Sequence, residues 1–76
     1  MIYIFSPKVP GEFLSHSDRL REQLPLKLKH ITMHPAEIVD DINLARISLI
    51  GLIQKWRQLK FLILDESGNC LETYFY

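Results

Sequence analysis

The residues best suited to chemistry are one cysteine and a pair of histidines. Cys70 is the only cysteine in the 76-residue chain, so the chain can form neither an internal disulfide nor a four-cysteine zinc site. His30 and His34 are four residues apart, a spacing that binds zinc on a helix. Pro35 and the strand-like pattern before it predict an extended segment instead, and no acid or cysteine lies close enough to complete a site. We therefore expect no bound metal, no cofactor and an unreactive Cys70.

The sequence also lacks an arrangement for nucleophilic or acid–base catalysis. None of its serines lies in a strained elbow motif. Asp40 and Asp41 are adjacent carboxylates, but neighbouring helix positions point about 100° apart, so the two would not face one another. They fit a solvated position near a helix start better. The 3 glycines are too widely spaced to cradle a phosphate, and we predict no catalytic residue.

Composition and charge favour a protein partner over nucleic acid. Hydrophobic residues are 47% of the chain and charged residues 24%, which is typical of an ordered domain. Nine Lys and Arg balance nine Asp and Glu, whereas a nucleic-acid-binding domain normally carries a basic excess. A basic patch is still conceivable, from Lys27, Lys29, Lys55, Arg57 and Lys60. Solvated strand and helix ends explain these residues equally well.

The length and the apolar runs predict one cytoplasmic domain over residues 1–76. No apolar run approaches the ~20 residues that cross a membrane, so we expect no membrane partner. Residues 1–10 lack the basic flank and the long apolar stretch of a signal peptide. A chain this short buries only about 60–65% of the surface that its unfolded form exposes. Its stability must therefore come from dense packing or from a partner.

The hydrophobic pattern predicts an α/β domain with the order β-α-β-α-β-β. The expected strands are 2–5, 26–33, 60–65 and 70–76, with a turn at 66–69, and the expected helices are 12–24 and 35–58. The long helix would begin at Pro35, because proline suits the first helical position, although its continuity is open. A helix separates the first two strands, so we expect them to be parallel. The result would be a four-stranded mixed sheet with helices packed on it.

The predicted long helix carries more apolar surface than one sheet face needs. One stripe recurs at helical spacing, and further apolar residues lie on other sides, namely Val39, Leu44, Ile47, Ile50 and Leu52. Tryptophan and tyrosine are frequent interface anchors, and an edge strand invites pairing. We therefore predict partner binding through Ile53, Trp56, Tyr74 and Tyr76. The alternative is a core tryptophan with tyrosines that cap the sheet.

The order of elements resembles the thioredoxin-like superfamily, especially its glutaredoxin-type members. In that family a Cys-x-x-Cys pair follows the first strand. Here the stretch from Val9 to Glu12 occupies that place, and its proline matches while both sulfurs are absent. Leu59 stands where the family has a cis-proline, and the usual final helix is missing. The resemblance implies this fold in a redox-inactive form.

These observations leave three hypotheses for function. The first is a non-catalytic interaction or regulatory module, homodimeric, that acts through the last strand and the late half of the long helix. The second is a small enzyme or ligand carrier that uses the 6–11 loop, with Lys8, Val9 and Pro10, because thioredoxin-like proteins bind their substrates there. The third is a nucleic-acid-binding accessory protein. The identity of the protein partner and of any small molecule is left open.

Overall fold

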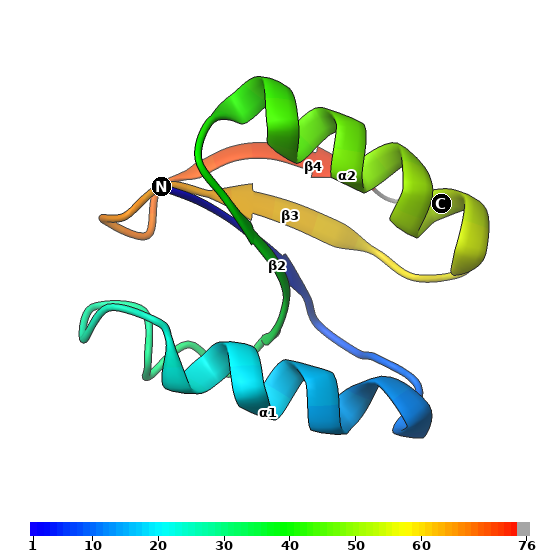
Figure 1. The fold of residues 1–76 in the computed structure, drawn as a ribbon, viewed down its shortest axis with the longest axis horizontal. Helices are drawn as coiled ribbons and strands as arrows, with labels where there is room; N and C mark the ends of the chain where they lie inside the picture. The colour runs from blue at the N-terminus through cyan, green and yellow to red at the C-terminus, as the bar shows by residue number, and fades with distance from the viewer. Residues whose placement is uncertain (75–76) are drawn as a thin grey trace.

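The computed structural model describes residues 1–74 and confirms the predicted order of elements. The elements are β1 (Ile2–Ser6), the 3₁₀ helix η1 (Gly11–Phe13), α1 (Leu14–Glu22), β2 (His34–Val39), α2 (Ile42–Lys55), β3 (Phe61–Leu64) and β4 (Cys70–Tyr74). The first helix and the first, third and fourth strands lie close to their predicted positions. Figure 1 shows the strands between α2 above and α1 below.

The sheet is antiparallel throughout, with the strand order β2-β1-β3-β4. The prediction of a mixed sheet with parallel first strands was therefore wrong. Ser6, the last residue of β1, pairs with His34, the first residue of β2. The chain leaves β1, runs through α1 and returns along residues 23–33 to the same end of β1. A connection that returns to its starting end enters the next strand in the opposite direction.

The segment 26–33, predicted to be a strand, forms turns that α1 holds in place. Backbone N–H groups of Leu28 and Lys29 donate to the Pro25 carbonyl, at 2.9 and 3.2 Å. The Arg21 guanidinium donates to the carbonyls of Ile31 at 3.0 Å and Lys29 at 3.3 Å, and also to the carbonyl of Met33. These backbone groups are satisfied without a neighbouring strand, which removes the reason for the segment to extend.

The long helix predicted from Pro35 begins seven residues later, at Ile42. Pro35 lies instead in β2, an edge strand, where its missing N–H is tolerated, and Ala36 bulges out of the register beside it. The Asp41 carboxylate accepts a hydrogen bond from the Leu44 N–H at 2.9 Å and caps the helix. The start of the helix is thus set by an aspartate cap, and α2 is continuous from Ile42 to Lys55.

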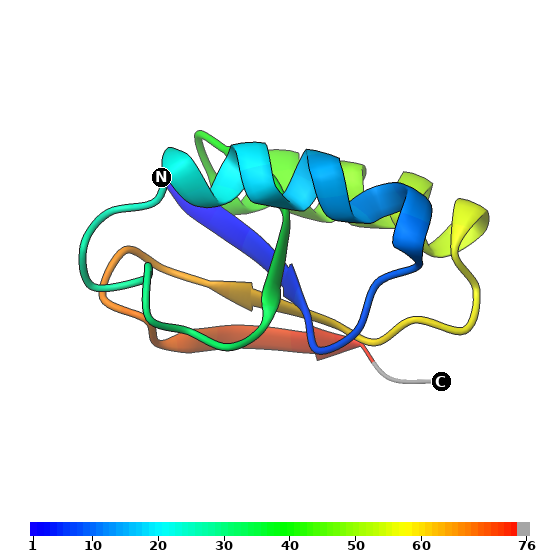
Figure 2. The same cartoon turned by 90° about the horizontal axis from the view of Figure 1, so that it is seen from below.

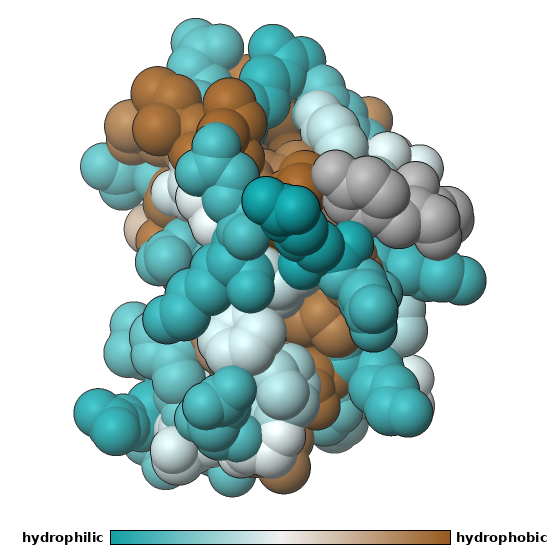
Figure 3. All heavy atoms as spheres, turned by 90° about the vertical axis from the view of Figure 1, so that its right-hand side faces the viewer, coloured by the Kyte–Doolittle hydropathy of each residue, from teal (hydrophilic) through white to brown (hydrophobic). Residues whose placement is uncertain are grey.

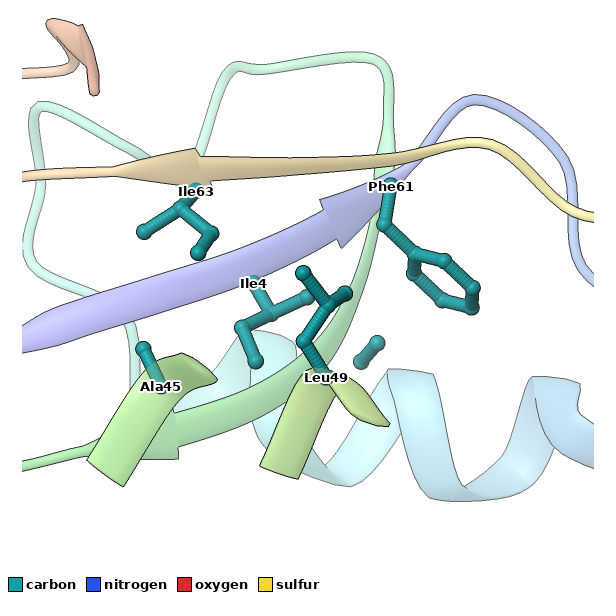
Figure 4. Packing of buried hydrophobic residues seen from close by; sticks show 6 residues of the cluster. Ile4, Ala45, Leu49, Phe61 and Ile63 are labelled. Atoms are coloured by element: carbon teal, nitrogen blue, oxygen red, sulfur yellow. The ribbon is translucent and has the colours of Figure 1, made fainter. Parts of the chain in front are cut away.

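The two helices cover opposite faces of the sheet, and each face has its own core. Ile4 and Ile63 pack with Ala45 and Leu49 of α2, and Figure 4 shows their side chains pointing toward one another. Neighbouring strand residues face the other way. On that side Tyr3, Phe5 and Leu64 pack with the buried leucines that follow α1, Leu24 and Leu28. Figure 2 views the domain from below, so that α1 lies in front of α2 along the top of the picture and β3 and β4 run along the bottom.

We predict that Arg21→Ala destabilises the domain by about 1–3 kcal/mol, because it leaves three loop carbonyls without their donor. Arg21→Lys should recover only part of the loss, since one ammonium cannot span carbonyls that a planar guanidinium reaches. Urea unfolding measures both changes. Arg19→Ala, at an exposed position of the same helix, is the matched control. An Arg21→Ala protein as stable as this control would contradict the prediction.

Candidate protein-interaction surface

The side of α2 that points away from the sheet is uncharged and exposes large aliphatic side chains. Ala45 and Leu49 are buried against the sheet. Leu44, Ile47 and Ile50 remain 43%, 66% and 59% exposed, and their spacing of three places them along one side of the helix. We define the α2 outer face as these three residues with the exposed uncharged residues around them, Asn43, Gly51 and Gln54. Figure 3 shows hydrophobic side chains gathered at the top of the molecule, where α2 lies.

Charged residues flank the α2 outer face without entering it. Arg46 and Lys55 are the charged residues of α2, and the helical rotation places them at its two edges. Single exposed leucines are ordinary on a protein surface, but several large aliphatic side chains in one uncharged strip mark interaction sites. The sequence showed the excess of apolar residues on this helix. It did not show which of them would face the sheet.

The residues predicted to bind a partner lie beside this face and pack against the core. Ile53, Trp56 and Tyr74 are half-buried and contact the same hydrophobic cluster. The Trp56 ring meets Phe13 edge to face, with centroids 6.1 Å apart, and the Lys55 amine lies 5.4 Å from its centre. All three side chains thus pack against the cluster on the α2 side of the sheet. Tyr76 lies outside the described residues.

An ion pair connects α2 to the edge strand β4. The Arg46 Nε donates to Glu72 Oε1 at 2.9 Å, and the Tyr74 hydroxyl donates to Glu72 Oε2 at 2.8 Å. The Arg46 hydrogen bond, followed by the Tyr74 hydrogen bond, lowers the pKa of Glu72. The same carboxylate raises the pKa of Tyr74. This contact fixes one edge of the α2 outer face to the sheet.

The loop predicted to bind a ligand borders a pocket of about 280 Å³. It is lined by Pro7, Lys8, Gln58, Leu59 and Lys60. Lys8 therefore lines the pocket, whereas Val9 and Pro10 are half-buried in the same loop. The lining surface is mostly apolar, although two of its residues are lysines.

The histidines, the cysteine and the lysines that the sequence offered for chemistry do not form a common site. Within residues 1–74 no three histidine, cysteine or acidic side chains are arranged to hold a metal ion. His30 is exposed in the loop before β2, whereas His34 is half-buried in that strand. Cys70 is an exposed free thiol at the start of β4, and Lys27 and Lys29 are exposed on turns. No helix in the described part of the chain is long and apolar enough to span a membrane.

The half-buried Asp65 carboxylate holds the turn before β4 in place. Asp65 accepts hydrogen bonds from the backbone N–H groups of Ser67 and Asn69, both at 2.9 Å. These bonds, with that of Asn69 the strongest influence, lower the pKa of Asp65. Gly68 has a φ of +89°, which other residues rarely adopt. The predicted turn is confirmed, and it returns the chain to pair β4 with β3.

Comparison with known proteins gives no relative from which to infer a role. No protein-family model matches the chain, and no match was found among curated proteins or among solved structures.

We predict that acid weakens the domain in part through Glu72. Because its pKa is lowered on folding, its contribution is complete above its ordinary value of 4.5 and is lost as the pH falls through the lower value of the folded state. Glu72→Gln should flatten the decline of the unfolding free energy below that pH. Urea titrations between about pH 7 and about pH 3 measure the slope. Glu22→Gln, at an exposed acid of α1, is the control, and equal slopes in both variants would contradict the assignment.

Proposed function

We propose that this domain is a non-catalytic protein-interaction module and that its binding surface is the α2 outer face. The observation that carries the proposal is the row of Leu44, Ile47 and Ile50, 43–66% exposed on a face without charge. Burying apolar surface contributes about 25 cal/mol per Å². Covering this face would therefore favour association, and the absence of charge on it removes the cost of burying an unpaired ion.

The way in which the face is held also supports binding. Ala45 and Leu49 fix the opposite side of α2 in the core, Asp41 caps its start, and Arg46 connects its edge to Glu72 of β4. A partner would meet side chains on a helix that is already formed. Little ordering entropy is then lost on binding, and more of the apolar contact remains as affinity.

The thioredoxin-like resemblance belongs to the same proposal. Val9 and Glu12 occupy the positions of the cysteines of that family in the loop after β1, which supports a redox-inactive role. The antiparallel β2 departs from the parallel pairing that we had expected. The interaction proposal does not depend on the resemblance, because it follows from the exposed side of α2.

The test is co-purification of the tagged protein from its native cells, compared with Ile47→Glu. A charge at the centre of an apolar interface typically costs ~2 kcal/mol or more, about a 30-fold loss of affinity. We expect Ile47→Glu to lose a partner that the wild type retains, whether another protein or an untagged copy of itself. Leu26→Glu, which changes a 78% exposed leucine in the loop after α1, should retain it. The proposal fails if no partner depends on Ile47.

The pocket beside Lys8 supports a second candidate function, binding of a small anionic molecule. Its volume of about 280 Å³ lies just below the usual range for ligand sites, and two lysines line it together with Leu59 and Pro7. Titration with glutathione to millimolar concentration, followed by Trp56 fluorescence, tests this. Lys8→Ala should weaken binding about tenfold if the ammonium pairs with a carboxylate. Absence of saturable binding would remove this candidate.

A further inference from the structure

We propose that the partner of the α2 outer face is a second copy of this chain, with the two α2 helices packed antiparallel about a twofold axis near Ile47. The inference rests on the proposed function, because it names the occupant of that same surface. In such an interface one patch meets itself, so the patch must be compatible with its own copy. The α2 outer face meets this condition, since two uncharged strips come together without burying an ion.

The charges at the ends of α2 select the antiparallel direction. Asp40 precedes the helix, whereas Lys55 ends it and Arg57 follows, and all three are exposed. A parallel pair would bring these like charges together. An antiparallel pair centred near Ile47 places Asp40 of each copy beside Lys55 of the other, at both ends of the contact. The opposed helix dipoles favour the same direction.

Gly51 supports the same register independently of charge. A β-carbon at this position would meet nothing within 4 Å, so packing within one chain does not require glycine. An internal helical glycine costs about 1 kcal/mol relative to alanine. In the register that places Asp40 beside Lys55, Leu44 of one copy lies opposite Gly51 of the other. The missing side chain at Gly51 then leaves room for Leu44, and Ile47 packs against its counterpart near the axis.

The size of the helix predicts a modest affinity. Fourteen residues give a helix about 21 Å long and roughly 10 Å wide. A contact confined to two such helices is smaller than the roughly 800 Å² per partner of a standard interface. We therefore expect a reversible dimer with a dissociation constant of about 1–100 µM, visible only in concentrated solution.

The register is tested by comparing the dimer affinity of the wild type with that of Gly51→Leu. Sedimentation of each purified protein from about 10 µM to about 1 mM measures this affinity. This change enlarges the apolar surface, so a nonspecific contact would become stronger. In the antiparallel register the new side chain collides with Leu44 of the other copy, and the dimer should weaken at least about tenfold. The melting temperature of the dilute monomer should stay the same or rise, because the position is open within the chain. That second measurement separates a lost interface from a misfolded protein.

Charge reversal tests the direction of the helices. Asp40→Lys should weaken the dimer about three- to tenfold, because it places two positive charges side by side. Adding Lys55→Asp should restore the affinity, because the positive and negative charges have then exchanged places. A dimer that is strengthened by Gly51→Leu, or unaffected by both charge changes, overturns the antiparallel register. If the wild-type protein is monomeric at about 1 mM yet binds another protein through Ile47, the partner is not a second copy. The proposed function as an interaction module would then still stand.

Discussion

The structure depends on two polar side chains of α1 that hold the returning loop. The Arg21 guanidinium donates hydrogen bonds to three backbone carbonyls of residues 29–33, and the buried Ser17 hydroxyl donates to the Pro35 carbonyl at 2.6 Å. Together they bring the chain back to the end of β1, so that β2 pairs antiparallel with it. The chain must then leave β2 at the other end of β1, which is where α2 begins. The position of the α2 outer face is thus a consequence of hydrogen bonds on the opposite side of the sheet.

The elements that could be predicted from the sequence are those whose signals are local. The apolar runs of β1 and β3 and the turn around Gly68 needed no distant partner to be recognised. The alternation of Leu26 and Leu28 indicated a strand, yet one of these leucines is 78% exposed and the other is fully buried within a turn. The deciding donor, Arg21, is up to twelve residues away from the carbonyls it binds. A window of sequence does not contain that interaction.

The exposed side of α2 could be predicted only in part, because apolar residues surround the helix. Apolar residues lie on every side of α2, so its few polar residues do not by themselves show which side is turned outward. Proline at a helix start and aspartate at a helix cap competed as signals, and the Asp41 cap determined the start. The side of α2 that faces the sheet is the one whose side chains pack best against the strands. Ala45 is small enough for close approach and Leu49 fills the space between Ile4 and Phe61. Ile53 and Trp56 pack half-buried against the core, while Leu44, Ile47 and Ile50 were left outside.

Large aliphatic residues that lie outside both core clusters are informative when they gather on one face. Leu44, Ile47 and Ile50 lie on the α2 outer face, where they add nothing to either core cluster. Gly51, directly after Ile50, weakens the helix without easing any contact inside the chain. Neither feature favours the isolated fold. Both favour a complex in which another helix crosses α2 closely, because the exposed aliphatics become buried and the glycine admits the approaching side chain. These two features are the physical reason for proposing a second copy as the partner.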